Sequence, residues 1–280
     1  MVNEKDLEEF VNQAEEAIAR RGESALRGAE KFLDPEHWLK WCDTTAEFYV
    51  AFCDQVERSL VFMVAHQTTQ RPDILNFLLT TDLEGRFPPL DIQHAGFGVV
   101  SWRIRYLMAQ ALVARLAERE TGPDLAASVD TAFDALWEIL ASDEPSGKER
   151  WQAYESILQL AMKNYDGILK SYDESYRFDL AAQEDSNRTL IKACYLLSQV
   201  TTGAADDDVK FGVATHDALL RFYYYLWLVN DDPSAWIDLV PLALICHLRH
   251  DIMAPGTPYD FVSSMAPRAV IDELRSLRSA

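Results

Sequence analysis

The sequence has 280 residues, enough to bury a substantial core in one large domain or two small ones. Its hydrophobic content of 49% and charged content of 25% are ordinary for a globular protein, whereas its formal net charge of −19 is not. This acidity argues against nucleic acid and anionic membranes as direct ligands, because both require a surplus of lysine and arginine. It favours a basic partner, although adaptation to high salt gives the same composition.

The first part of the chain is expected to be helical. Apolar residues recur at helical spacing over residues 3–33, with a weak point at Gly22. Pro35 is expected to begin a second helix that runs to about residue 66, with its aromatic side chains on one face and its acidic side chains on the other.

The second half contains the most hydrophobic stretch of the sequence, residues 216–251. Two apolar segments are joined there by Asn-Asp-Asp-Pro, and both are expected to form helices inside the protein. Asp232 is a good N-cap for the second of these helices. Pro241 is expected to kink the same helix, because proline lacks a backbone donor.

The periodicity of the whole chain predicts an all-α protein. Apolar residues recur at helical spacing, and no Asn-Gly or Asp-Gly hairpin signal occurs. Long helices with short connections favour an antiparallel helical bundle of about nine to eleven helices, built as one bundle or as two packed sub-bundles. The DEPSG loop suggests an N-terminal helical half, residues 1–143, and a C-terminal helical half, residues 144–280, which we expect to form one compact unit.

Cysteine usage points to a reducing compartment. The four cysteines are scattered, and none forms a Cys-x-x-Cys pair: Cys42, Cys53, Cys194 and Cys246. The first residues are acidic and unlike a secretion signal, and charged residues and a proline interrupt the best candidate for a membrane span. We therefore expect a cytoplasmic protein.

Asp43, Glu47 and Asp54 form the first acidic group. Asp43 and Glu47 are one turn apart on the expected second helix and Asp54 lies three turns beyond Asp43, so we expect all three carboxylates to share one stripe. Carboxylates on bundle helices can bind divalent metals or act as acid and base, but a di-metal bundle also needs Glu-x-x-His pairs, which are missing. A charged stripe opposite an aromatic face is most often the solvated side of a helix.

Asp206, Asp207 and Asp208 form the second acidic group. Helical prenyl-transferring and terpene-cyclising enzymes bind magnesium pyrophosphate through aspartate-rich motifs that face an aromatic cavity. This chain does contain a run of aromatic residues: Phe222, Tyr223, Tyr224, Tyr225 and Trp227. The aspartate spacing that those enzymes need is absent, so the three residues are expected to begin a helix, where negative charge complements the helix dipole.

His247 and His250 are three residues apart and could supply two metal ligands from one side of a helix. No cysteine or third histidine lies near them in the sequence to complete a site. Positive side chains near a helix C-terminus are also expected without a metal, because they complement the dipole.

Three arginines lie within apolar helices: Arg103, Arg105 and Arg221. A buried guanidinium is strongly destabilising unless a carboxylate pairs with it. The expected partners are Asp54, Glu57 or Asp217, in structural ion pairs rather than in an anion-binding site.

The function that these patterns favour is protein binding. No phosphate-binding loop, dinucleotide fingerprint, nucleophile elbow or zinc-protease motif occurs, so no catalytic residue, metal or cofactor is assigned. In its acidic, all-helical character the chain is similar to helical bacterial immunity proteins, which neutralise toxins by docking an acidic face on a basic partner. That resemblance covers no motif, and it implies an immunity- or antitoxin-like inhibitor.

The expected acidic docking surface consists of six residues: Asp43, Glu47, Asp54, Asp206, Asp207 and Asp208. The alternative is a helical enzyme or small-molecule binder, either terpenoid-synthase-like or a di-metal bundle, with an aromatic cavity and a divalent metal bound by carboxylates.

Overall fold

The computed structural model describes residues 4–32, 42–67, 91–117, 123–141, 148–175, 186–231 and 238–279. Within these ranges the chain forms eleven α-helices, one short 3-10 helix and no strand, which confirms the prediction of an all-α helical bundle. None of the helices in these ranges has both the length and the apolar character of a membrane span.

The helices divide between the two parts of the chain. The first part contains α1 (Glu4–Phe32), α3 (Thr45–Ala65), the 3-10 helix η2 (Ile92–His94), α5 (Phe97–Leu116) and α6 (Pro123–Leu140). The second part contains α7 (Lys148–Ala161), α8 (Tyr165–Ser175), α9 (Ser186–Thr201), α10 (Asp207–Asn230), α11 (Leu239–Met253), α12 (Phe261–Ser264) and α13 (Pro267–Ser279).

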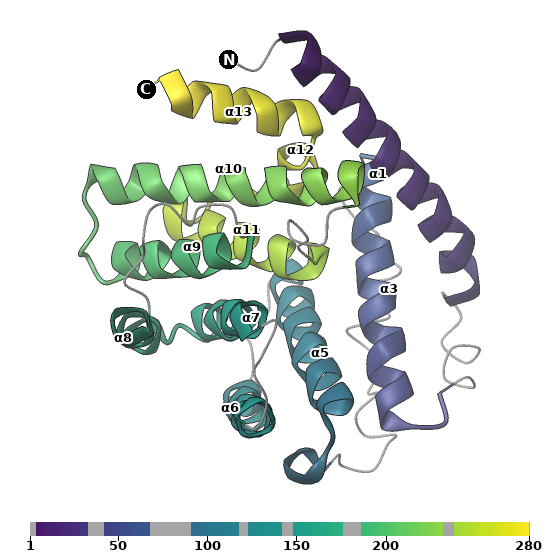
Figure 1. The fold of residues 1–280 in the computed structure, drawn as a ribbon, viewed down its shortest axis with the longest axis vertical. Helices are drawn as coiled ribbons and strands as arrows, with labels where there is room; N and C mark the ends of the chain where they lie inside the picture. Colours follow the sequence, from purple (N-terminus) through teal and green to yellow (C-terminus); the bar gives the residue numbers. More distant parts are fainter. Residues whose placement is uncertain are drawn as a thin grey trace.

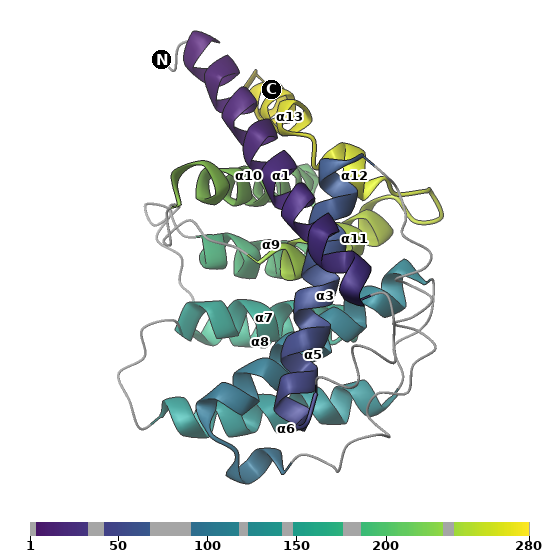
Figure 2. The ribbon, with the colours of Figure 1, turned by 90° about the vertical axis from the view of Figure 1, so that its right-hand side faces the viewer.

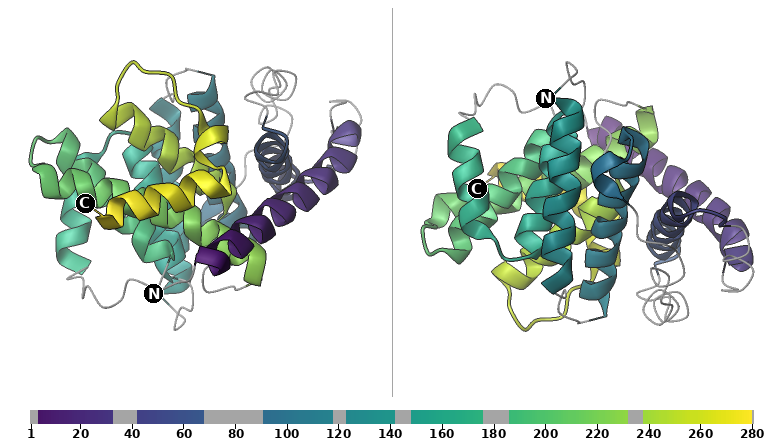
Figure 3. Two further views of the ribbon diagram at one scale, coloured as in Figure 1. Left: turned by 90° about the horizontal axis from the view of Figure 1, so that it is seen from above. Right: turned by 90° about the horizontal axis from the view of Figure 1, so that it is seen from below.

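The helices are stacked in layers. In Figure 1, α13 lies at the top, α10 and α9 run antiparallel beneath it, and α7, α8 and α6 lie below. Figure 2 shows α1 and α3 crossing one side of this stack, and Figure 3 shows α13 lying across α10 from above. The two ends of the chain are joined by ion pairs of 2.7 Å, from Arg268 to Glu8 and from Arg275 to Glu4.

Helix α11 is the central element. It packs against α3, α5, α7, α9 and α10, and every residue from Leu239 to Cys246 is buried. A helix without a polar face can be stable only when other helices surround it. Within the hydrophobic stretch 216–251, the segment from Leu239 to Cys246 therefore lies in the middle of the core.

The expected kink at Pro241 is wrong. Helix α11 begins at Leu239, directly after Asp238, so Pro241 lies in the first helical turn. Backbone N–H groups in the first turn have no partner within the helix, so proline removes no hydrogen bond there. Asp232, the expected cap, lies outside the described residues.

Gly22 allows two helices to approach closely. Helix α1 continues through this residue without interruption, and a Cβ atom built on Gly22 would lie 2.2 Å from the Cβ of Ala65 on α3. Since no real pair of carbon atoms packs at that distance, a larger residue would separate α1 from α3. The weak point in the helix pattern is therefore a packing position.

We predict that Gly22→Ala lowers the free energy of unfolding by about 1–3 kcal/mol, because overpacking costs more than the roughly 1 kcal/mol gained in helix propensity. Chemical denaturation measures the change. Gly98→Ala on α5 is the matched control, since no atom lies within 4 Å of its added Cβ. If Gly22→Ala stabilised the protein as much as the control, the close approach would be refuted.

Candidate functional site

Glu47 has a structural role at the start of α3. Its carboxylate accepts hydrogen bonds from the backbone N–H groups of Asp43 and Thr44, at 2.8 and 3.0 Å. The side chain of Thr44 accepts from the N–H of Glu47, which completes a capping box. Because α3 begins at Thr45, Asp43 precedes the helix and does not share a helical stripe with Glu47 and Asp54.

The other predicted acidic residues also have local partners. Asp54 pairs with Arg58 one turn along α3, at 2.6 Å. Asp206 is the N-cap of α10, as its expected role in beginning a helix requires, and accepts from the N–H of Val209 at 2.9 Å. In the first turn of α10, Asp207 pairs with Lys210, and Asp208 is exposed. Asp207 and Asp208 both lie at the N-terminus of the helix, where the helix dipole favours negative charge.

The two predicted acidic groups do not form one surface. Helix α3 packs along α1, on the side of the molecule where α10 ends, whereas Asp206 is at the beginning of α10 (Figure 1). The 24 residues of α10 span about 36 Å at the helical rise. A single partner would therefore have to contact two separate parts of the protein surface to bind both acidic groups.

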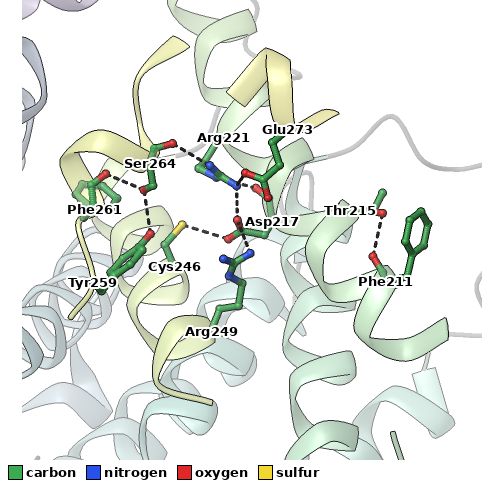
Figure 4. Close-up of polar contacts among 10 residues, drawn as sticks. All are labelled: Phe211, Thr215, Asp217, Arg221, Cys246, Arg249, Tyr259, Phe261, Ser264 and Glu273. Atoms are coloured by element: carbon green, nitrogen blue, oxygen red, sulfur yellow. Dashed lines mark hydrogen bonds and ion pairs between the residues drawn. The ribbon is translucent and has the colours of Figure 1, made fainter. Parts of the chain in front are cut away.

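A buried ion-pair cluster connects α10, α11 and α13 (Figure 4). Arg221 contacts Asp217 at 2.5 Å and Glu273 at 2.7 Å, and donates to the carbonyl of Ser264 at 2.8 Å. Arg249 reaches the same carboxylate of Asp217 at 3.0 Å. Burial alone would lower the pKa of Arg221, but the two carboxylates outweigh it and raise the pKa. The expected pairing of Arg221 with Asp217 is confirmed.

We predict that Asp217→Asn lowers the free energy of unfolding by about 3–5 kcal/mol, because Arg221 and Arg249 would then lose their shared counter-ion inside the protein. Asp207→Asn on the same helix is the control: it removes an exposed pair and should cost less than about 1 kcal/mol. Urea denaturation compares them, and equal losses would contradict a buried, structural role for Asp217.

A second buried cluster surrounds Asp238. Its carboxylate receives hydrogen bonds from Arg150 at 2.7 Å and from the hydroxyl of Tyr154, and Arg105 contacts it at 3.5 Å. Asp238 was not among the partners expected for Arg105. Arg103 donates to the hydroxyl of Tyr49 at 2.7 Å.

The cluster around Asp238 borders a small cavity. The cavity of about 20 Å³ is also lined by Cys53 and Glu57 of α3. That volume holds a single water molecule. Burial, followed by the negative charge of Asp238, raises the pKa of Glu57 to about 7, although Arg21 and Arg105 oppose the shift. The cavity is too small for a substrate, so we treat this cluster as structural.

We predict that Glu57→Gln stabilises the protein at alkaline pH. The folded-state pKa of about 7 exceeds the ordinary 4.5, so the stability associated with neutral Glu57 is complete below pH 4.5 and is lost as the pH rises through 7. The variant should be more stable than the wild type at pH 8 by on the order of 2 kcal/mol, and equal to it near pH 4.5. Denaturation across this range measures the difference. Destabilisation by the variant at pH 8 would show that Arg21 and Arg105 hold Glu57 charged.

The two histidines of α11 have structural partners. The ring of His247 packs 4.8 Å from Tyr259, and burial, Arg115 and His250 lower its pKa to about 4. His250 places its Nε2 atom 2.9 Å from both the carbonyl and the hydroxyl of Thr257. Among the described residues, no three histidine, cysteine, aspartate or glutamate side chains are grouped so that they could hold a metal ion.

The tyrosine run of α10 belongs to the core. Tyr224 and Tyr225 are fully buried, and the hydroxyl of Tyr225 donates to the carbonyl of Met265. Trp227 lies further along the helix, with the guanidinium of Arg21 stacked 4.5 Å from its ring. These aromatic side chains therefore point to different surroundings rather than converging on one chamber.

Figure 1 shows α6 and α8 beside α7. Residues of these three helices and of α9 line a cleft of about 320 Å³, which we call the α7 cleft. One side is a polar row on α7, whose members recur at helical spacing: Lys148, Gln152, Glu155, Ser156 and Gln159. The other sides are apolar and aromatic, and come from α6, α8 and α9: Trp137, Leu140, Ile168, Tyr172 and Ile191. The volume is at the lower end of the range for small-ligand sites.

Glu155 is the acidic group inside the α7 cleft. The indole N–H of Trp137 donates to one of its carboxylate oxygens at 3.2 Å. Burial raises the pKa of Glu155 to about 6; the Trp137 hydrogen bond opposes this shift, and the charges of Asp134 and Asp130 add to it. Glu155 is therefore a partly buried carboxylate that is mostly ionised at neutral pH and has two further carboxylates of α6 near it.

Helix α6 has a row of exposed acidic side chains beside the cleft. Asp130, Asp134 and Glu138 are spaced one turn apart, and all three are exposed. The helix contains no lysine or arginine. We call these three residues the α6 stripe.

Sequence reasoning missed both the α7 cleft and the α6 stripe. One signal for the stripe was present: no lysine or arginine occurs between Arg119 and Lys148, although acidic residues recur throughout that segment. The cleft had no comparable signal, because its walls come from four helices that only the fold brings together.

Comparison of the chain with protein-family models, with curated proteins and with solved structures finds no match. A function can therefore be inferred only from the geometry and charge of the described residues. The α7 cleft with the adjoining α6 stripe is the candidate functional site. Among the described residues no arginine pairs with its carboxylates, whereas arginines neutralise those of the two buried clusters.

Proposed function

We propose that this chain is a protein-binding module that recognises a basic protein through the α6 stripe and the α7 cleft. The observation that carries the proposal is the row of exposed carboxylates, without an intervening base, beside a cleft that contains a further carboxylate and an exposed part of Trp137. Opposite charge increases the rate of encounter, and aromatic anchors in a cleft hold the complex together.

The sharpest form of the proposal is an immunity- or antitoxin-like inhibitor that covers a basic partner. The net charge of −19 supports this form, since it disfavours nucleic acid and anionic membranes as competing ligands. We further propose a cytoplasmic location, because all four cysteines are free and buried, and burial raises the pKa values of Cys53, Cys194 and Cys246.

We predict that the double reversal Asp134→Lys with Glu138→Lys slows association with the basic partner about tenfold at low salt, because electrostatic steering accounts for 10- to 1,000-fold in such rates. The partner is first recovered by affinity capture on the wild-type chain. Stopped-flow or surface-based kinetics at low and high salt then measure the effect, which should shrink as salt screens the charges.

The matched control is Asp207→Lys with Asp208→Lys, which changes the net charge equally at the exposed start of α10. If the control slowed association while the α6 reversal did not, the surface predicted from sequence would be the docking face. If neither reversal changed the rate at low salt, charge complementarity would be refuted as the basis of recognition.

A further inference from the structure

We propose that the α7 cleft receives one arginine side chain of the basic partner, with Glu155 as its counter-ion; this inference rests on the proposed function. The cleft is large enough for one long side chain, and it combines a carboxylate with aromatic and aliphatic walls. Those are the two surfaces that an arginine presents, a charged planar head and an apolar stem.

The carboxylate of Glu155 has one oxygen to offer. The indole N–H of Trp137 occupies the other oxygen, at 3.2 Å, and so fixes the orientation of the group. No hydrogen bond to the remaining oxygen comes from any described residue. A guanidinium carries five N–H donors in one plane, so it can donate to this oxygen while neighbouring donors reach the amide oxygens of the polar row.

The walls favour arginine over lysine. Trp137 lines the cleft beside Glu155, and Tyr172, Leu140 and Ile168 complete an apolar surface around it. A guanidinium stacks on aromatic faces and is more weakly hydrated than an ammonium, so it loses less hydration on entering such a site.

The charges around the cleft favour a cation beside Glu155 and disfavour one beside Lys148. Asp130 and Asp134 on α6 face Glu155, and a cation would relieve the repulsion among the three. Lys148 lies seven residues before Glu155 on α7, about 10.5 Å along the axis, and would repel a second cation there. On the remaining walls, Tyr172 accepts a hydrogen bond from Lys192 of α9 at 3.0 Å. The cleft therefore accommodates one cation beside Glu155 and disfavours a second one beside Lys148.

The test uses N-acetyl-arginine amide as the probe, with N-acetyl-citrulline amide as its uncharged isostere. Each is titrated into the full chain while the indole N–H of Trp137 is followed by NMR, with Trp137→Phe identifying that signal. We expect a saturable shift with the arginine probe, in the millimolar range for so small a ligand, and at least tenfold weaker binding of the citrulline probe.

The pH dependence needs no variant. Glu155, with a pKa near 6, is about nine-tenths ionised at pH 7 and about nine-tenths protonated at pH 5, so the arginine probe should bind about tenfold more weakly at pH 5. Glu155→Gln should abolish both the binding and this dependence. Asp166→Asn, an equal charge change on the exposed surface of α8, should preserve both.

Equal shifts with the two probes, or arginine binding that survives Glu155→Gln, would overturn this inference. Its failure can be distinguished from failure of the proposed function. If the probe did not bind but reversal of the α6 stripe still slowed association with the basic partner, only the role of the cleft would be lost. If the probe bound and the reversal had no effect, the arginine site in the α7 cleft would be supported and the role of the α6 stripe in recognition would be refuted.

Discussion

Helix α11 is anchored at both ends by a buried carboxylate that guanidinium groups neutralise. At its start, Asp238 is met by Arg150, and near its end Arg249 contacts Asp217, which also binds Arg221. Removing a carboxylate from water costs several kcal/mol unless cations and hydrogen bonds replace the lost hydration. Each anchor is therefore stable only when helices distant in sequence are correctly packed. These anchors tie α7, α10 and α13 to the central helix, and α7 forms one wall of the α7 cleft.

The sequence was sufficient to predict features that depend on local spacing. Helical periodicity predicted the all-α fold, and the four-residue separation of Asp217 and Arg221 places them one turn apart on any helix. The partners of Asp238 could not be predicted, because Arg150 lies 88 residues away and Arg105 lies 133 residues away. The kink expected at Pro241 failed for a local reason, since the effect of a proline depends on where its helix begins.

The same holds for the candidate site: roles set by neighbouring residues in the sequence could be predicted, and contacts between separate helices could not. Both Glu47 and Asp206 cap helices; this role was expected from the sequence for Asp206, whereas Glu47 was selected only for its charge. The α6 stripe is visible in the sequence as a helix with acids and no bases, yet its importance depends on Trp137 and Glu155 lying beside it. The hydrogen bond between Trp137 and Glu155 joins α6 to α7. Only the packing of these helices shows that the row of surface charges borders a cleft.

The central claim is that the excess negative charge serves to meet a basic protein at one face of the helical stack. Hydrogen–deuterium exchange of the full chain, alone and saturated with its captured basic partner, tests this most directly. We predict slower exchange in the complex for amides of α6, α7 and α8, with α1 and α13 unchanged. Protection confined to the beginnings of α3 and α10, with α6 to α8 unchanged, would contradict it.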